Sequence, residues 1–298
     1  MSRILVAGVA VLDFVFHMKT FPRQAEKYRA DGASISGGGN AANAAVAISR
    51  LDGSAYLASR LGNDQIADMI IADLEKEGVG TGLIRRHGDN RSSFSSIYID
   101  EAGERQIMNY RDPDLPVQAA WPDDQIPDAL SATLADTRWP DGALAAMKLA
   151  KQLGIPGVMD AEAPVHEAEH AVLEASHVAF SAQGVQDFTG ESDIEKAAVL
   201  AYDMVPGTVL VTDGENGVVS VSNRTPQWTP AFAVKAIDTL GAGDVWHGAF
   251  ALALGEGKLQ AQAIEFASAA AAIKCGRTGG RDGAPNRAEV NQFLKETS

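Results

Sequence analysis

The sequence predicts an α/β fold in which a mainly parallel, doubly wound sheet is flanked by helices and carries a small β-sheet lid. Residues 3–16 form a nearly continuous apolar run, which is typical of a strand buried on both faces of a parallel sheet. From residue 132 onward, short apolar runs alternate with helical patterns, as in chains of β/α units. Two runs of alternating polarity, 92–99 and 104–110, interrupt this rhythm and predict a β-hairpin around Asp100-Glu101-Ala102-Gly103.

Composition limits the class of protein. The 298 residues are 46% hydrophobic and 21% charged, as in an ordinary globular protein, and the length allows one large α/β domain or two domains. The formal net charge of −14 argues against a nucleic-acid partner, because few cations remain to neutralise phosphates. A single cysteine, Cys275, excludes an intramolecular disulfide and fits the reducing cytoplasm. We expect neither a signal peptide, since Asp13 interrupts the short apolar start, nor a membrane span.

Three glycines at 37–39 open the next structural unit. The alanine-rich run over 40–48 behind them predicts a helix packed tightly on the sheet, and the structural role expected for Asn40 is that of its N-cap. Further along, 54–61 predicts a strand and 65–77 predicts an amphipathic helix, which ends at Gly78.

The second half of the chain continues the β/α rhythm. The predicted strands are 132–136, 156–160, 177–181 and 208–212. The predicted helices are 141–154, 165–175, 192–202, 259–275 and 286–296. The polar loop 276–285 is the segment expected to be most flexible.

The strongest functional motif is Asp238-Thr239-Leu240-Gly241-Ala242-Gly243-Asp244, which is followed by an apolar face at helical spacing over 245–254. The two glycines leave the first N–H groups of that helix accessible at the positive end of its dipole, so they can hold an oxyanion or a phosphate. A carboxylate at 244 would repel such an anion unless it accepts a proton from the attacking nucleophile. Phosphoryl transfer to an alcohol needs this pair of features.

Two other interpretations of the glycines remain open. Gly241 to Gly243 could form an ordinary tight turn, with Asp244 as a first-turn acid favoured by the helix dipole. Glycines 37–39 could serve a nicotinamide oxidoreductase, but its G-x-G-x-x-G motif directly follows the first strand, and here the glycines come well after it. The chain also lacks the P-loop pattern G-x-x-x-x-G-K-[ST], so a helix terminus around Gly241 would have to replace it.

The whole string from Asp238 to Asp244 resembles the signature of the ribokinase-like sugar kinases, the PfkB carbohydrate kinase family, and the resemblance covers essentially the full chain. It implies an ATP-dependent kinase with Mg²⁺ as cofactor. In that family the residue at Asp244 takes the proton of a sugar hydroxyl, and the backbone of Gly241, Ala242 and Gly243 holds the transferred phosphoryl group. The resemblance also implies that Asp238 helps to bind a monovalent cation such as K⁺, although a plain turn residue is an equal alternative.

The same resemblance implies a sugar site under a lid. The insertions at about 14–35 and 92–111 would form the lid within a single kinase domain of residues 1–298. An exposed sheet edge on that lid would favour a homodimer. The implied sugar-binding residues are Asp13, Gly38, Gly39 and Asn43.

For the nucleotide, the resemblance places Thr212 and Gly214 beside ATP, in a strand that ends in a glycine turn at Gly217, with Gly243 also in contact. One departure concerns the metal. The family often carries Asn-x-x-Glu near the end of a mid-chain strand, where it helps to position magnesium-bound water. This chain has Ser181-Ala182-Gln183-Gly184 at that place, which leaves the handling of magnesium open.

The strings around 103–115 and 134–143 resemble those of the sulfofructose kinases of sulfoquinovose breakdown. In that branch a Lys, an Asn and an Arg bind the sulfonate, and Lys27, Asn109 and Arg138 stand at these places, although isolated Lys and Arg residues are commonly surface charges. The implied reaction is phosphorylation of the 1-hydroxyl of 6-deoxy-6-sulfofructose. The alternatives are a fructokinase or a phosphofructokinase-type ketose kinase, and a catalytically silent sugar-binding regulator, against which Asp244 counts.

Overall fold

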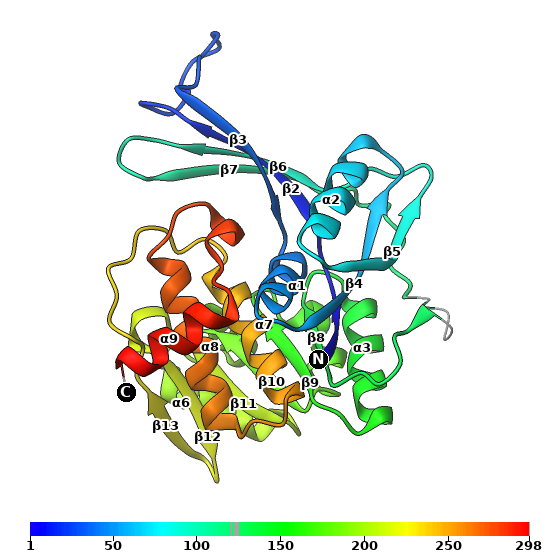
Figure 1. The fold of residues 1–298 in the computed structure, drawn as a ribbon, viewed down its shortest axis with the longest axis vertical. Coiled ribbons are helices and arrows are strands. Elements are labelled where there is room, and N and C mark those ends of the chain that lie inside the picture. The colour runs from blue at the N-terminus through cyan, green and yellow to red at the C-terminus, as the bar shows by residue number, and fades with distance from the viewer. Residues whose placement is uncertain (120, 122–124, 298) are drawn as a thin grey trace.

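The computed structural model describes residues 1–119, 121 and 125–297, which form a nine-stranded sheet and a separate four-stranded sheet. Figure 1 shows the small sheet projecting from the body of the molecule. Helices cover the large sheet, so the predicted α/β fold class is confirmed. Among the described residues, none of the helices combines the length and the hydropathy that a bilayer crossing requires.

The large sheet has the strand order β13-β12-β11-β10-β9-β8-β1-β4-β5 and is parallel from β11 to β5, with β12 and β13 antiparallel at one edge. The chain runs outward from β1 through β4 to β5 and then resumes at β8 on the other side of β1. The strand order therefore switches between β1 and β8. The strands are β1 (Arg3–Ala7), β4 (Ser54–Gly62), β5 (Gly80–His87), β8 (Ala132–Asp136), β9 (Gly157–Ala161), β10 (His177–Ser181), β11 (Thr208–Thr212), β12 (Val218–Ser222) and β13 (Thr225–Thr229).

Two hydrophobic cores lie on the two faces of this sheet. Ile4 and Val6 belong to one core and Leu5 and Ala7 to the other, so β1 is buried on both faces as its apolar sequence predicts. Helices α1, α2, α7, α8 and α9 pack in the first core, and α3, α4, α5 and α6 in the second. The helices are α1 (Asn40–Arg50), α2 (Gln65–Lys76), α3 (Pro140–Leu153), α4 (Glu169–Val172), α5 (Ala182–Thr189), α6 (Ile194–Met204), α7 (Ala242–Gly255), α8 (Gln260–Cys275) and α9 (Arg287–Thr297).

The small sheet has the order β3-β2-β6-β7 and contains the predicted hairpin. Its strands are β2 (Val11–His17), β3 (Gly32–Gly38), β6 (Phe94–Ile99) and β7 (Arg105–Tyr110). The single strand expected over 3–16 is wrong, because the chain leaves the large sheet after Ala7 and enters the small one at Val11. Between these two strands, the Val9 N–H donates to the Asp136 side chain. Asp13 therefore lies inside a strand of the small sheet.

One helix prediction differs from the structure, and some elements of the structure were not predicted. The helix expected over 165–175 is reduced to a 3₁₀ turn (His166–Ala168) and the short α4, since the chain turns to enter β10 soon afterwards. The loop 276–285, expected to be flexible, contains a 3₁₀ turn (Gly280–Gly283) in which Arg281 is only 3% exposed. Strands β5, β12 and β13 and helix α5 lie in stretches for which no element was predicted.

Candidate active site

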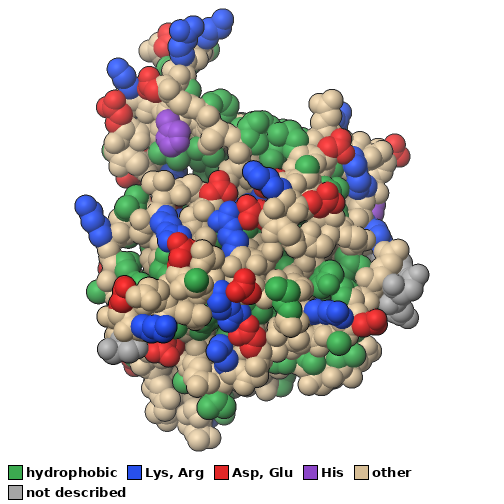
Figure 2. All heavy atoms as spheres, in the orientation of Figure 1, with side chains coloured by type: hydrophobic (Ala, Val, Ile, Leu, Met, Phe, Trp, Pro, Cys, Tyr) green, Lys and Arg blue, Asp and Glu red, His purple; other side chains and the backbone are tan. Residues whose placement is uncertain are grey.

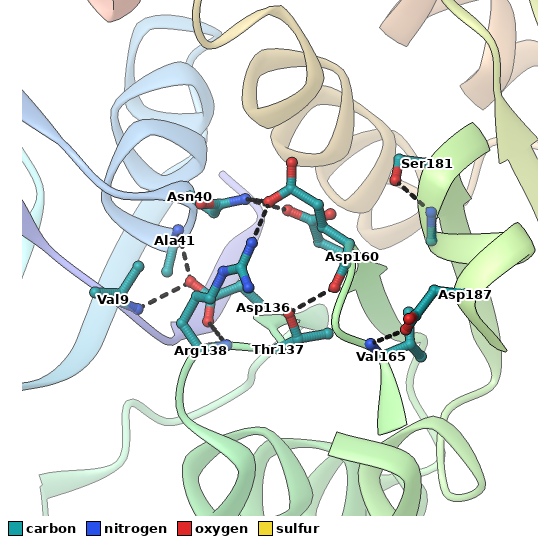
Figure 3. A network of polar contacts seen from close by, with 12 residues as sticks. Val9, Asn40, Ala41, Asp136, Thr137, Arg138, Asp160, Val165, Ser181 and Asp187 are labelled. Carbon is teal, nitrogen blue, oxygen red and sulfur yellow. Dashed lines mark hydrogen bonds and ion pairs between the residues drawn. The ribbon is translucent and has the colours of Figure 1, made fainter. Parts of the chain in front are cut away.

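The candidate site lies at the carboxyl ends of β1 and β8, where doubly wound sheets bind ligands. Asp136, the last residue of β8, is 2% exposed, and its Oδ2 accepts hydrogen bonds from the N–H groups of Val9 (2.9 Å) and Ala41 (3.1 Å). Its Oδ1 accepts the Arg138 N–H at 2.8 Å. Burial raises the pKa of Asp136, while these three N–H donors act to lower it. Asp136 thus joins the ends of both strands to the start of α1 (Figure 3).

The glycines at 37–39 bring the small sheet against the start of α1. Gly39 is the helix N-cap, with a φ of 95° in the left-handed region that favours glycine. The expectation that Asn40 is the N-cap is therefore wrong. Its Nδ2 instead donates to Glu162 Oε2 at 3.0 Å and to Asp160 Oδ2 at 3.4 Å. Beside Gly39, the Asp13 carboxylate fills the space where a side chain at Gly38 would stand.

Asn43 and Asp244 meet across the site, although 201 positions separate them in the chain. The Asn43 side chain on α1 donates from Nδ2 to Asp244 Oδ2 at 2.7 Å, and Asn43 is 8% exposed. Its Oδ1 is buried without a hydrogen-bond partner among the residues that the structure describes. Since an unpaired buried polar atom is costly, this oxygen is an acceptor available to a donor group of a bound ligand.

Asp244 has the protonation behaviour that a general base needs. Burial raises its pKa to about 7, and the nearby Asp160 carboxylate contributes to the rise, while the Asn43 donor and His247 oppose it. A carboxyl that titrates close to neutral pH can accept a proton and later release it.

The turn before Asp244 presents two free backbone donors. Gly241 is the N-cap of α7, with a φ of 76° that an L side chain rarely adopts. The Leu240 N–H donates to Asp238 Oδ1 at 2.9 Å and the Ala242 N–H to the Thr239 carbonyl at 3.1 Å, so these two are engaged. Within the described part of the chain, the N–H groups of Gly241 and Gly243 have no partner. These two N–H groups are therefore the donors that the turn leaves available to an anion.

A buried polar cluster lies behind the pair formed by Asn43 and Asp244. Asp160, at the carboxyl end of β9, is 5% exposed, and its burial, reinforced by Glu162, raises its pKa well above the usual range. His247 on α7 places Nδ1 at 2.8 Å from the Gly243 carbonyl and Nε2 at 3.5 Å from Asp160 Oδ1. Burial lowers the pKa of His247. His247 therefore ties the first turn of α7 to the strand ends.

A polar row crosses the small sheet on the face that carries Asp13. The strand register places Ser36, Asp13, Ser95 and Asn109 opposite one another on β3, β2, β6 and β7, so their side chains share one face. Asn109 Nδ2 donates to Ser95 Oγ at 3.0 Å, and the Ser95 side chain bonds to Asp13. Burial raises the pKa of Asp13, while Ser95 and the more distant Arg281 act to lower it.

The three residues expected to bind a sulfonate do not converge in this structure. Asn109 lies in the polar row, whereas the Arg138 guanidinium pairs with Glu162, with Nη2 at 2.9 Å from Oε2. Lys27 is exposed in the connection between β2 and β3, beyond His17 at the far end of the small sheet. At a rise of about 3.3 Å per residue, His17 alone is roughly 13 Å from Asp13.

The residues expected beside the nucleotide lie farther along the same sheet edge. Thr212 ends β11 opposite Ser181 of β10, and Thr212 Oγ1 donates to the Phe180 carbonyl at 3.3 Å. Gly214 and Gly217 shape the turn between β11 and β12, where the Asp213 N–H donates to the Gly217 carbonyl at 2.8 Å. Ser181, in place of the missing Asn-x-x-Glu, is the N-cap of α5 and accepts the Gly184 N–H at 2.9 Å.

Five titratable residues of the site were not predicted as site residues from the sequence: Asp136, Asp160, Glu162, His247 and Arg281. Asp136 could have been predicted as a site residue, because it is an acidic residue at the end of an apolar strand. The Arg281 guanidinium lies against Gly37 and pairs with Asp73 of α2, 208 positions away in the chain. No local pattern indicates that contact, because the two residues meet only in the folded chain.

Comparisons with known proteins agree with this geometry. Residues 1–287 match the sequence pattern of the pfkB family carbohydrate kinases. The chain is 30% identical over 290 residues to a probable fructokinase-5 of Arabidopsis thaliana, covering 88% of this chain and 89% of the relative. It is 27% identical to a ribokinase of Bacillus subtilis (strain 168), covering 99% and 100%. A solved structure from Agrobacterium tumefaciens with a provisional ribokinase assignment is 33% identical, with coverage of 99% and 98% and a TM-score of 0.93. The chain belongs to the pfkB family of carbohydrate kinases.

Proposed function

We propose that this ATP-dependent sugar kinase phosphorylates the 1-hydroxyl of 6-deoxy-6-sulfofructose. The observation that carries the kinase chemistry is the Asn43–Asp244 pair beside the free N–H groups of Gly241 and Gly243. As the hydroxyl oxygen bonds to the γ-phosphorus of ATP, Asp244 accepts its proton and the bond to the β–γ bridging oxygen breaks, releasing ADP. The N–H groups stabilise the negative charge on the transferring group.

The sugar would lie between the polar row of the small sheet and the start of α1. Asp13 supplies a carboxylate for hydroxyl donors, and the unpaired Asn43 Oδ1 accepts another. Asn109 and Arg138 approach this region from different directions: Asn109 through Ser95 and Asp13, Arg138 through Glu162 and Asn40. A sulfonate that reached both would be bound by one neutral and one cationic donor, and the presence of these donor types is the support for an anionic ketose, since the two side chains do not converge in this structure.

A second candidate is a neutral sugar such as fructose or ribose. Two observations favour it. The Arg138 guanidinium already has a carboxylate partner in Glu162, and Lys27 lies beyond the far end of the small sheet. The similar proteins from Arabidopsis thaliana and Bacillus subtilis are a probable fructokinase and a ribokinase.

Magnesium fits this site as an ion that arrives with the triphosphate. Within the described ranges, no group of three or more His, Cys, Asp or Glu residues could hold a metal ion. Mg²⁺ commonly keeps several waters and binds through substrate phosphates, neutralising their charge. We assign Asp160 and Glu162, at the strand end beside Ser181, as the carboxylates that would hold magnesium-bound water in place of the missing Asn-x-x-Glu.

The substrate is tested by ADP release with Mg²⁺, ATP and a panel of sulfofructose, fructose 6-phosphate, fructose and ribose. We expect kcat/KM for sulfofructose to exceed the others by about a hundredfold, which is about 2.7 kcal/mol of discrimination. Arg138→Ala should raise KM for sulfofructose by about tenfold and leave activity on fructose unchanged. Equal losses on both sugars would assign Arg138 to the support of Glu162, and a preference for fructose or ribose would establish the second candidate.

We also propose that the small sheet forms a homodimer through the face opposite the polar row. There the register aligns Ile35, Phe14, Ser96 and Met108, and Ile35 and Met108 are 54% and 72% exposed. Figure 2 shows hydrophobic side chains gathered around the small sheet. Sedimentation equilibrium should give a dimer for the wild type and a monomer for Ile35→Lys/Met108→Lys. A monomeric wild type would contradict the proposal, and Leu153→Lys, at an exposed site on α3, is the control.

A further inference from the structure

Asp238, the first residue of the Asp238–Asp244 motif, is surrounded by hydrogen-bond donors. Its Oδ1 accepts the Leu240 N–H at 2.9 Å and an Arg105 N–H from β7 at 2.8 Å. Its Oδ2 accepts the N–H groups of Gly279 and Gly280, each at 3.1 Å. Burial acts to raise the pKa of Asp238, but these donors and the cations of Lys274 and Arg105 outweigh it and lower the pKa. Asp238 is therefore an ionised carboxylate with both oxygens engaged.

A second cation at this motif, besides Arg105, is the ammonium of Lys274 on α8. Lys274 is fully buried, and its Nζ donates to the Asp238 carbonyl at 2.6 Å and lies 3.6 Å from Asp238 Oδ2. The next residue of α8 also bonds to this segment, because the Cys275 carbonyl accepts the N–H groups of Ile237 (2.7 Å) and Asp238 (3.1 Å). The end of α8 thus holds the segment 237–241 just before the anion hole.

A monovalent cation does not fit beside Asp238. All three oxygens of the residue already accept N–H donors: the carbonyl from Lys274, and the carboxylate from Leu240, Gly279, Gly280 and Arg105. A potassium ion here would also lie next to a buried ammonium of the same charge, which is unfavourable in a poorly solvated site. An ammonium group is similar in size to K⁺ and carries the same charge, so it can supply the same field to the loop.

We propose that the Lys274 ammonium is a resident cation that holds segment 237–241 in the shape of the anion hole, so this kinase needs no potassium. The inference rests on the proposed role of that turn in phosphoryl transfer. Lys274 touches no reacting atom and is a positioning residue. Its side chain acts through Asp238, whose Oδ1 fixes the Leu240 N–H and with it the approach to Gly241.

The first test uses the wild-type protein in potassium-free buffer, with choline chloride replaced stepwise by KCl at a constant ionic strength of about 100 mM. We expect kcat for the best sugar of the panel to change by less than about threefold. Hydrogen exchange of the bonded amides in this segment, those of Ile237, Asp238, Leu240 and Ala242, should be equally slow in both salts. A larger rise in kcat, or added protection of these amides by K⁺, would overturn the inference. Absence of ADP release with every sugar would instead overturn the proposed function.

The second test removes the ammonium. Lys274→Met keeps an apolar stem of similar length, and we expect kcat in choline to fall by about tenfold or more and exchange in 237–243 to accelerate. Lys274→Ala leaves space for an ion, so K⁺ or NH₄⁺ should restore part of its activity, which a merely structural role would not produce. Lys295→Met, at an exposed lysine of α9, is the matched control. Full activity of Lys274→Met in choline would contradict the positioning role of Lys274, and so would the absence of any response of Lys274→Ala to K⁺ or NH₄⁺. If both variants unfold, the wild-type test in potassium-free buffer still decides whether the kinase needs potassium.

Discussion

Asp244→Asn should lower kcat by about a thousandfold, within the range of about 10² to 10⁴ that general-base catalysis contributes, and equivalent to about 4 kcal/mol. The amide keeps the shape of the carboxylate, and its oxygen can still accept the Asn43 donor. It also removes a carboxyl whose pKa burial raises to about 7, so the melting temperature should not fall. Single-turnover kinetics with saturating ATP and sugar measure the chemical step, and nucleotide titration should give an unchanged Kd for ATP.

The control for this variant is Asp89→Asn, which changes an exposed aspartate outside the site. The wild-type pH profile tests the same assignment. Because the carboxylate form is the base, kcat/KM should be constant above a pH of about 7 and fall tenfold per unit below it. Turnover of Asp244→Asn within tenfold of the wild type would remove Asp244 from the role of base.

Asp13→Asn should lower kcat/KM for the sugar by about a hundredfold, or about 2.7 kcal/mol, because a hydrogen bond to a charged group contributes about 1.5–3 kcal/mol. Asp13 is partly buried over Gly38 and bonded to Ser95, so its carboxylate cannot be replaced by water without rearranging the polar row. KM for ATP should remain unchanged, because the residues proposed to contact the nucleotide, Thr212 and Gly214, belong to or follow β11 of the large sheet, whereas Asp13 lies in the small sheet. Initial-rate kinetics with each substrate varied in turn give both constants.

Asp31→Asn is the matched control for this second variant. Asp31 is exposed at the opposite end of the same β2–β3 pair, where its N–H donates to the His17 carbonyl at 2.8 Å. Its kinetics should match the wild type. An equal rise in KM for sugar and ATP in Asp13→Asn would show a loss of the fold around the small sheet, and unchanged kinetics would place the sugar elsewhere.

Local sequence patterns predicted the features that depend on neighbouring residues. The hairpin around Asp100–Gly103 is present because its turn closes within the segment itself, with the Gly103 N–H donating to the Asp100 carbonyl at 3.0 Å. The turn at Gly241 forms for the same reason, since glycine tolerates the φ of 76° that starts α7. The burial of β1 on both faces was predicted from its apolar sequence alone.

Predictions that depended on distant residues were less complete. The strand expected over 3–16 breaks because Asp136, far along the chain, accepts the Val9 N–H. Asn40 was expected to cap its own helix, but Glu162 and Asp160 bind its side chain. Arg138 is expected from the sequence to bind a substrate anion, but in the folded chain Glu162 pairs with its guanidinium. In each case the deciding partner lies on another element.

The sequence by itself identified the family, through the resemblance of the string Asp238–Asp244 to a known signature. It also determined the alternation of strands and helices and the glycine turn that precedes Asp244, because period and turn chemistry are local properties. Only the tertiary structure decided what surrounds that turn. Asn43 reaches Asp244 across 201 positions and Lys274 reaches Asp238 across 36, and no periodicity links such pairs. Burial then shifts the pKa values of these groups, because withdrawal from water disfavours the charged form. It raises the pKa of Asp244 and lowers the pKa of Lys274, whose ammonium is stabilised against this effect by Asp238.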